Sequence, residues 1–165
     1  MFHKSLKAAF AISILAGLCI QANAGEHERS EVGLRALLAY ELAEVKSSSD
    51  LKKYQDRAGR TSPLEKLSPA AKSRFIESLS FSQNGLSQYR YDALQSELSA
   101  SETYKVLRIF GAEQSAPFLH ESKVKSDIDR GIATLRMAED HKDAKCISHG
   151  TCETGWVGYI CTSNC

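Results

Sequence analysis

Residues 146–165 read Cys146-Ile-Ser-His-Gly-Thr-Cys152-Glu-Thr-Gly-Trp-Val-Gly-Tyr-Ile-Cys161-Thr-Ser-Asn-Cys165. This stretch holds four of the five cysteines of the chain and its only tryptophan, but a single charged residue, Glu153. A segment this short buries too little apolar surface to fold by itself, so crosslinks must hold it. The cysteine density therefore predicts a disulfide-bonded tail and divides the chain into two parts.

The four cysteines follow the spacing C-x5-C-x8-C-x3-C, and we expect all four to form disulfides. Four cysteines allow three pairings. Pairing of Cys161 with Cys165 is the least favoured, because so short a loop restricts disulfide geometry. A zinc site with His149 as an extra ligand is the alternative, but zinc knuckles favour C-x2-C pairs. We expect no metal ion and no cofactor, and a mostly irregular backbone with room for one short strand or hairpin.

Four apolar side chains of the tail are the candidates for contact with a target: Trp156, Val157, Tyr159 and Ile160. Tryptophan and tyrosine are effective at membrane interfaces and in protein pockets, because one end is apolar and the other polar. The alternative is that these side chains pack on the rest of the protein. Trp156 lies between Cys152 and Cys161, where crosslinked ends would present it on a small loop.

The segment Cys152-Glu-Thr-Gly-Trp-Val-Gly-Tyr-Ile-Cys161 resembles the C-x-T-G-W-V-x-x-x-C element of the bacteriocin fulvocin C and its related precursor proteins. Cys152, Gly155, Trp156, Val157 and Cys161 carry the resemblance. In that family a signal and a mostly polar pro-region precede a short cysteine-rich peptide. The resemblance implies a secreted antibacterial peptide at the C-terminal end of the chain.

Residues 1–24 have the three parts of a secretory signal peptide. Lys4 and Lys7 precede an apolar run over residues 8–20, and small residues lead to a cleavage site after Ala24. A helix of that length spans about 20 Å, short of the roughly 30 Å core of a bilayer. A lipoprotein anchored at Cys19 is the minor alternative. We expect the export machinery to recognise this segment. The protein is then expected to be secreted or periplasmic, in an oxidising compartment.

Residues 25–145 contain no cysteine and show helical spacing of apolar residues. Apolar residues over 31–46 form one stripe, Ser68-Pro69 begins a second helix, and Gln83-Asn84-Gly85 interrupts the pattern before a third. Further helices are expected from Ser101 to Gly111 and after Ser126. Seven aromatic residues at helical spacing are expected in the core: Phe75, Phe81, Tyr89, Tyr91, Tyr104, Phe110 and Phe118.

The predicted fold class is therefore mainly α, with a small bundle of short helices and the disulfide-bonded tail. No strand of useful length is expected before Cys146. The predicted domains are a signal peptide over 1–24, a helical pro-region or carrier domain over 25–145, and a cysteine-rich peptide over 146–165. Lys145, at the end of a polar stretch, is the expected processing site of a trypsin-like protease, with Lys142 as the alternative.

The chain shows no phosphate-binding loop, nucleophile elbow or metal-binding histidine pair, so no enzyme is expected. Its formal charge of +1 gives no indication of nucleic-acid binding. Two functions remain. One is a bacteriocin-like precursor whose tail is the active peptide, acting on a bacterial envelope target, either the membrane or a receptor. The other is an intact periplasmic or secreted helical protein of binding or structural type with a disulfide-locked tail. The oligomeric state is left open.

Overall fold

The computed structural model describes residues 33–119, 124–135 and 140–165. The chain divides into two compact units, Met1–Arg35 and Ala36–Cys165, and the fold of the second unit positions the tail. The predicted signal peptide and its cleavage site at Ala24 lie outside the described residues. Within those residues, no helix is long and apolar enough to cross a membrane.

The helices are short, and serine side chains begin several of them. The N-cap serines predicted before Pro69 and Asp127 are present, since Ser68 accepts from Ala71 N–H and Ser126 accepts from Asp129 N–H. The α-helices are α2 (Ser48–Ala58), α3 (Pro69–Glu77), α4 (Asp92–Glu97), α5 (Ala100–Arg108), α6 (Ala116–Leu119) and α7 (Asp127–Ala133). Short 3-10 helices are η1 (Gly59–Thr61), η2 (Pro63–Lys66) and η3 (Glu113–Ser115), and residues 36–42 are also helical.

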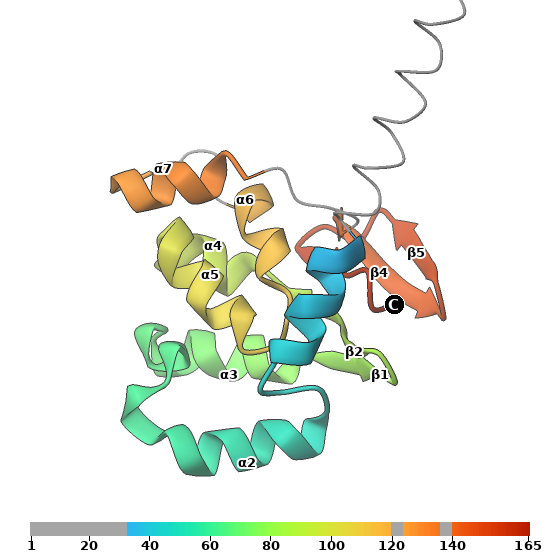
Figure 1. Ribbon diagram of the computed structural model, residues 1–165, viewed down its shortest axis with the longest axis horizontal. Coiled ribbons are helices and arrows are strands. Elements are labelled where there is room, and N and C mark those ends of the chain that lie inside the picture. The colour runs from blue at the N-terminus through green and yellow to red at the C-terminus, as the bar shows by residue number, and fades with distance from the viewer. Residues whose placement is uncertain (1–32, 120–123, 136–139) are drawn as a thin grey trace, which may run out of the picture. The chain divides into compact units, whose positions relative to one another are not determined.

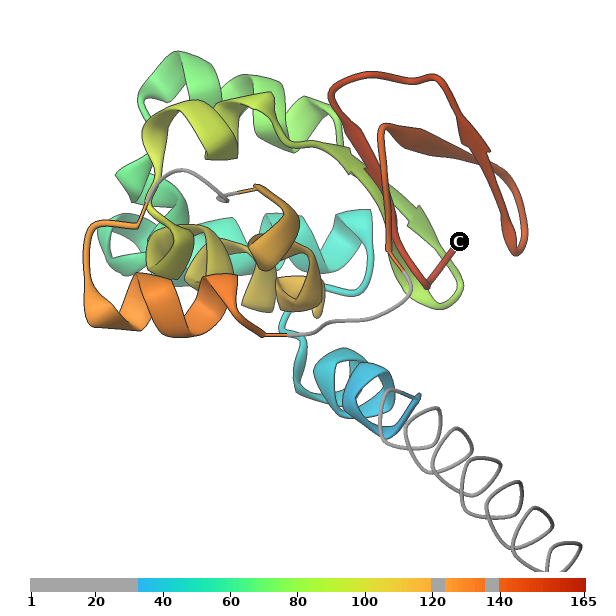
Figure 2. The ribbon, with the colours of Figure 1, turned by 90° about the horizontal axis from the view of Figure 1, so that it is seen from above.

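Two antiparallel sheets accompany these helices. The larger sheet has the order β1-β2-β6-β3, with β1 at Ser80–Ser82, β2 at Gly85–Arg90, β6 at Tyr159–Cys161 and β3 at His141–Lys142. The smaller one is a hairpin of β4 (Ala144–Ser148) and β5 (Thr151–Thr154). The helices α3 to α7 lie to one side of the strands, and the β4–β5 hairpin lies at the opposite end (Figure 1). The view from above shows the same separation (Figure 2).

The prediction of a mainly α fold is wrong, because the described chain is a mixed α/β protein with two antiparallel sheets. The residues interpreted as a break between helices, Gln83-Asn84-Gly85, form the turn of the β1–β2 hairpin at Gln83-Asn84 and the first residue of β2 at Gly85. Gly85 has φ +107°, and a Cβ atom there would lie 3.2 Å from the Tyr40 ring. The Asn-Gly pair is a hairpin signal. Strands of three and six residues are too short to show a clear period of two, which is why the pattern did not indicate them.

The prediction of a mostly irregular tail is also wrong. Strand β6 pairs with β2 on one side and with β3 on the other, so that Ile160 faces both Tyr89 and Lys142 in register. Its partners come from outside the tail, which explains why the composition of residues 146–165 does not indicate this arrangement. Residues on both sides of Cys146 therefore belong to the same sheet and the same compact unit.

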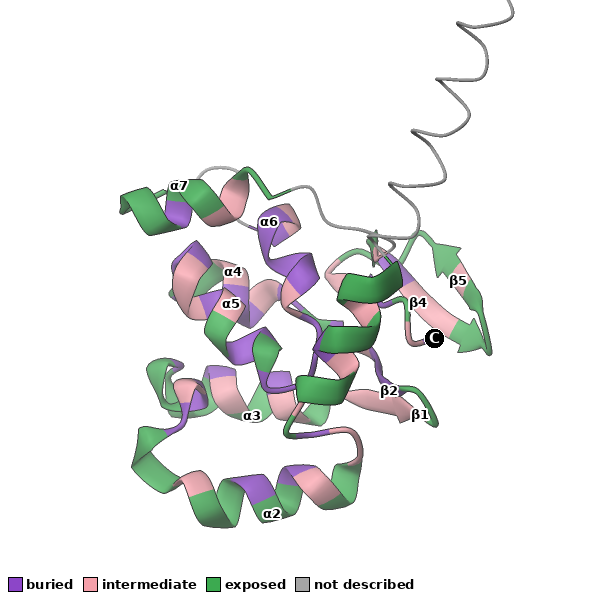
Figure 3. Cartoon of the chain, viewed as in Figure 1, coloured by how far each residue is buried: buried purple, intermediate pink, exposed green. Residues whose placement is uncertain are grey.

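One hydrophobic core joins the helices to the larger sheet. Phe75 packs edge-on against Tyr89 and Phe110, with ring centroids 5.9 and 6.0 Å apart. Both α3 and the tail contribute to this core, since Phe75 and Ile160 are fully buried within it. The predicted aromatic core is confirmed for Phe75, Tyr89, Tyr91 and Phe110, which are all buried. The purple segments of Figure 3 follow α5, α6 and β2 through the middle of this unit.

The first predicted helix does not bury its leucines. Leu37, Leu38 and Leu42 are each half or more exposed, and the helix ends at residue 42 (Figure 3). Among the described residues of this helix Ala39 is the buried one, and its carbonyl oxygen approaches Gly111. A small residue allows the two backbones to come close, and this contact rather than the leucine stripe decides which face is covered.

Candidate interaction site

The tail contains two disulfides, Cys146–Cys165 and Cys152–Cys161, so the predicted disulfide bonding of all four cysteines is confirmed. Of the three possible pairings, the structure has one that avoids the short Cys161–Cys165 loop. Both bridges lie inside residues 146–165 and pack around the buried methyl group of Ala144. Disulfides of this kind are typical of oxidising compartments.

Residues 155–158 form a loop between β5 and β6, and the Cys152–Cys161 bridge joins the two strands that carry it. Gly155 and Gly158 have φ values of +96° and +91°. Glycine adopts this left-handed region without the steric penalty of a Cβ atom. The loop therefore turns sharply at both ends and places Trp156 and Val157 at its tip.

Asp143 holds this loop from outside the tail. Its backbone carbonyl accepts hydrogen bonds from the N–H groups of Gly155 and Trp156, each at 3.0 Å. Its carboxylate Oδ1 accepts from Gly158 N–H at 3.0 Å and from the Tyr91 hydroxyl at 2.6 Å. We call these four interactions the Asp143 clamp. Three loop residues are thereby fixed to one side chain and one carbonyl, so the loop is ordered before any partner arrives.

The electrostatics of the clamp follow from these contacts. The hydrogen bond from Tyr91, followed by that from Gly158, lowers the pKa of Asp143 below its ordinary value. Burial of Tyr91, together with its bond to the charged Asp143, raises the pKa of the phenol to about 12. The pair is therefore a carboxylate and a neutral phenol over the physiological range. Asp143 adopts φ +57°, a conformation that aspartate tolerates better than most residues.

Trp156 is held at the surface by polar contacts at its edge and face. Its indole Nε1–H donates to Glu153 Oε2 at 2.9 Å. The Lys145 ammonium lies 4.0 Å from the Trp156 ring centroid and 4.1 Å from that of Tyr159. The Trp156 side chain remains 42% exposed and Val157 is 81% exposed. The loop thus presents an oriented aromatic ring and an aliphatic group to solvent.

The four predicted contact residues separate into two groups. Trp156 and Val157 point outward, whereas Ile160 is fully buried in the core. Tyr159 is half-buried, with Lys145 over its ring and the Arg90 guanidinium 5.6 Å from its centroid. Trp156 and Val157 belong to the loop, whereas Tyr159 and Ile160 are successive residues of β6 and face opposite sides of the strand.

Lys145, the predicted processing site, lies within β4 and is paired in register with Glu153 of β5. It is half-buried, and its ammonium group contacts the two aromatic rings described above. A protease that cleaves after Lys145 would need this strand to leave its hairpin. The other predicted processing residue, Ala24, lies outside the described residues.

The end of the tail has further ties to the rest of the chain. The Thr162 hydroxyl donates to Leu86 O at 2.5 Å, and the Ser82 hydroxyl donates to Asn164 O at 2.6 Å. Asp140 accepts from Ser163 N–H at 2.8 Å and from the Ser115 hydroxyl. Removal of this carboxyl from water raises the pKa of Asp140. Residues 162–164 are therefore bonded to the β1–β2 hairpin and, through Asp140, to η3.

The sequence alone did not identify Asp143, Tyr91 or Arg90 as parts of this site. Asp143 lies in a polar stretch with no glycine or proline to mark a turn, and Tyr91 was expected on a helix. The available signal was the pair of glycines around Trp156-Val157. Two glycines so close together favour a tight loop. Such a loop needs an acceptor for its N–H groups, but the sequence did not show where that acceptor lies.

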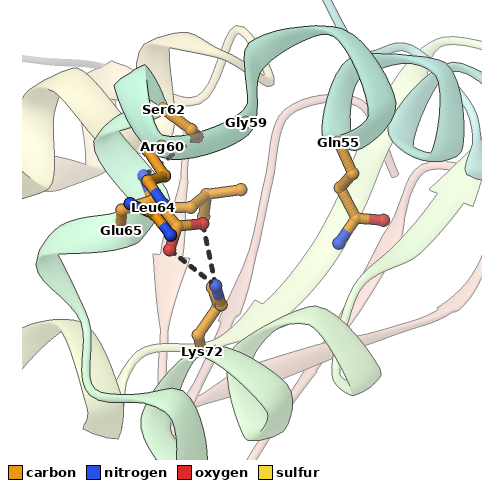
Figure 4. A pocket seen from close by; sticks show the side chains of 7 residues that line it. All are labelled: Gln55, Gly59, Arg60, Ser62, Leu64, Glu65 and Lys72. Carbon is orange, nitrogen blue, oxygen red and sulfur yellow. Dashed lines mark hydrogen bonds and ion pairs between the residues drawn. The ribbon is translucent and has the colours of Figure 1, made fainter.

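A separate hollow of about 310 Å³ lies between α2 and α3 (Figure 4). Glu65 and Lys72, which both line it, form an ion pair, with Lys72 Nζ 2.8 and 2.9 Å from the two carboxylate oxygens. The remaining side chains that line it are those of Gln55, Arg60, Ser62 and Leu64, with the backbone of Gly59. These polar groups are common at an exposed surface, so we place the candidate site at the clamped loop.

No protein-family model, curated protein or solved structure matches this chain. Its function is therefore inferred from the geometry of the tail and its contacts.

Substitution of Asp143 tests the clamp. Asp143→Ala should lower the free energy of unfolding by about 2 kcal/mol, because it removes a charged acceptor and places alanine at a positive φ. Trp156 is the only tryptophan of the chain, so its fluorescence anisotropy should fall as the loop loosens. Asp143→Asn, which keeps an acceptor oxygen and tolerates this backbone, is the matched control and should lose less than half as much.

The pH dependence gives a second readout for the same residue. The pKa of Asp143 is lower in the folded protein than in the unfolded chain, so the ionised carboxylate stabilises the folded state. This contribution to the free energy of unfolding is fully present above the unfolded pKa, which is near 4, and is lost as the pH falls through the folded pKa. Acid unfolding monitored by tryptophan fluorescence should therefore be less steep below about pH 4 in Asp143→Asn than in the wild type. Equal slopes in the two proteins would contradict the assignment.

Proposed function

We propose that this protein is exported and acts intact as a binding protein, with the loop 155–158 as its contact surface. The observation that carries this proposal is the Asp143 clamp: a residue outside the tail orders the loop that carries Trp156. A loop ordered in advance loses little conformational entropy when it binds. Catalysis is not part of this proposal.

Two features support export to a secreted or periplasmic location. Residues 1–24 have the sequence of a signal peptide, and the tail is closed by two disulfides. The cysteines of the tail would meet oxidising conditions only after export, so the loop would take its final form outside the cytoplasm.

The loop chemistry favours a partner with an apolar pocket or interface. Trp156 and Val157 supply the apolar contact, and Lys145 and Glu153 stand beside the indole ring. A receptor of the bacterial envelope or a membrane surface offers such a site, and nucleic acid does not. Tryptophan is enriched among the residues that dominate binding energy at interfaces.

Binding to isolated envelope preparations tests this proposal. Trp156→Ala should weaken binding of the intact protein at least tenfold while leaving both disulfides and the thermal midpoint unchanged, because the ring is largely outside the core. Ile128→Ala is the matched control, since Ile128 is 69% exposed on α7, far along the chain from the loop. Equal losses in the two variants, or binding unaffected by Trp156→Ala, would refute the role of the loop.

A released antibacterial peptide is the second candidate, and one observation favours it. Both disulfides join cysteines within residues 146–165, so a peptide cut after Lys145 would keep its crosslinks. The resemblance of residues 152–161 to the fulvocin C element supports the same function. Intact-mass analysis of the exported product separates the two candidates: a single species of residues 25–165 favours the binding protein, and a species of residues 146–165 favours the peptide.

Activity of the peptide has its own test. The synthetic oxidised peptide 146–165 should inhibit growth of related bacteria if it is the active form, and the same peptide with Trp156→Ala should not. An inert wild-type peptide would remove the antibacterial candidate and leave the binding protein.

A further inference from the structure

The two disulfides of the tail lie against each other. The Sγ atoms of Cys146, Cys161 and Cys165 are all within 4.8 Å of one another, although Cys161 is bonded to Cys152 and not to either of them. Atoms about to react stand roughly 3–3.5 Å apart, so a small side-chain rotation brings Cys161 into contact with the neighbouring bridge. The three sulfurs form a group in which a bond can move from one pair to another.

Each bridge has one buried end and one end that solvent reaches. Cys161 is fully buried and Cys165 is 5% exposed, whereas their partners Cys152 and Cys146 are half-buried. A thiol from solution therefore meets Cys152 or Cys146 first. Attack at Cys152 releases Cys161 as the thiolate, inside the group of three sulfurs and away from solvent.

A hollow of about 320 Å³ leads to these bridges. One cysteine of each bridge, Cys152 and Cys165, lies in its wall together with His141, Gly150, Thr162 and Ser163. This volume accommodates a thiol of the size of cysteine.

We propose that the tail is a thiol–disulfide exchange site for low-molecular-weight thiols, with Cys161 as the internal relay. The incoming thiol loses its proton to solvent water, and its thiolate attacks Cys152 Sγ. A mixed disulfide forms there, the Cys152–Cys161 bond breaks, and Cys161 takes the electron pair. This inference is independent of the binding role, because no residue of the loop 155–158 takes part.

The relay continues within the protein. Cys161 attacks Cys165 Sγ, which lies within 4.8 Å of it, and Cys146 leaves as a thiolate. The Cys161–Cys165 bond that forms closes the short loop that the resting structure avoids, so it is the strained bridge of the exchanged form. Cys146 and Cys152 are register partners of the β4–β5 hairpin, so Cys146 then attacks Cys152 Sγ and expels the external thiolate. The two original bridges are replaced by two new ones and the thiol is regenerated, so the bridges are exchanged without net oxidation. If a second thiol attacks the mixed disulfide instead, two thiols are oxidised to a disulfide and one bridge is reduced.

The surroundings of the sulfurs set the direction of the internal step. Carbonyl oxygens of Ser148 and Thr151 lie 3.2 and 3.4 Å from Cys165 Sγ, and they disfavour negative charge on that atom. The two carbonyl oxygens near Cys146 Sγ lie farther away, that of Ser148 at 3.7 Å and that of Cys165 at 3.9 Å, and Cys146 is closer to solvent. Because the more stable thiolate is the better leaving group, Cys146 departs and Cys165 stays bonded.

The variant Cys152→Ser isolates the relay, because it leaves Cys161 as a free thiol beside an intact bridge. The folded protein is treated with iodoacetamide, and the label and bridges are mapped by mass spectrometry. We expect the label on Cys146, with Cys161 in a bridge to Cys165. Cys146 is the more exposed thiol, and its irreversible alkylation shifts the exchange equilibrium toward the Cys161–Cys165 bridge. Label on Cys161, with the Cys146–Cys165 bridge intact, would overturn the proposal.

Cys161→Ser is the matched control. It removes the relay sulfur, so exchange at the Cys146–Cys165 bridge can start only from Cys152, whose Sγ does not lie within 4.8 Å of both sulfurs of that bridge, and exchange should be at least tenfold slower than in Cys152→Ser. Thermal unfolding of both variants verifies that they fold.

The wild-type chain provides a test that does not depend on either variant. With limiting glutathione followed by rapid alkylation, the free thiol should appear on Cys146 and the glutathione on Cys152. Glutathione on Cys152 with Cys161 as the free thiol would show that no relay operates, and the absence of any mixed disulfide would refute the exchange site itself.

Discussion

Removal of residues 146–165 should unfold the remaining described domain. Strand β6 lies between β2 and β3, so its loss separates those strands and leaves Tyr89 without its partner Ile160. Ile160 is fully buried, and loss of one such side chain typically costs about 2–5 kcal/mol. Small domains have only about 5–15 kcal/mol in total, and the truncation also removes both ladders of β6. A chain that stops at Lys145 should therefore lose its cooperative thermal transition.

Circular dichroism and thermal melting of the truncated and full-length chains measure this effect. The matched control is the double substitution Trp156→Ala and Val157→Ala in the full-length chain, which removes exposed parts of the tail and should shift the midpoint by only a few degrees. A truncated chain that melts cooperatively near the full-length midpoint would show that residues 25–145 fold alone, as a carrier with a detachable peptide requires.

Gly111→Ala should be strongly destabilising. Gly111 has φ +67°, and a Cβ atom there would lie 2.6 Å from the carbonyl oxygen of Ala39. The left-handed conformation costs a residue with a Cβ atom about 1–2 kcal/mol, and the clash adds a further cost of about 1–3 kcal/mol. The contacted atom belongs to the backbone, so it cannot rotate away. We expect the thermal midpoint to fall by roughly ten degrees or more.

Gly131→Ala is the control of the same chemistry. Gly131 lies within α7, its φ is not positive, and nothing lies within 4 Å of the position of the added Cβ atom. Alanine favours helix more than glycine does, so this variant should be stabilised by about 0.5–1 kcal/mol. Chemical denaturation of both variants gives the comparison, and equal effects would mean that the approach of Ala39 to Gly111 is not a close contact.

Structural features that depend on a few neighbouring residues were predicted correctly from the sequence. The capping serines before Pro69 and Asp127 begin helices where expected, because the hydrogen bond of an N-cap joins residues three apart. The cysteine density correctly indicated disulfides, since so short a segment has no other means of holding its shape. The outward position of Trp156 also followed from local sequence, through its place between Cys152 and Cys161.

Features that depend on contacts between residues far apart in the sequence could not be predicted from the sequence. Leu37, Leu38 and Leu42 have the spacing of a buried face, yet the close approach of Ala39 to Gly111 leaves that face exposed. In the candidate site, the sequence indicated Trp156 and Val157 but not Asp143, whose role depends on hydrogen bonds to a loop twelve or more residues away.

By itself the sequence determined that the tail is crosslinked, that Phe75, Tyr89, Tyr91 and Phe110 lie in the core and where several helices begin. Only the tertiary structure decided which cysteines pair, that β6 enters a sheet with β2, and that Asp143 orders the loop. The pairing of Tyr89 with Ile160 joins residues about seventy positions apart. A strand of three residues is too short to show an alternation of apolar and polar residues, so the sequence does not indicate which strand it pairs with. Capping bonds and crosslinking density depend on neighbours along the chain, whereas strand pairing depends on which surfaces meet once the core has formed.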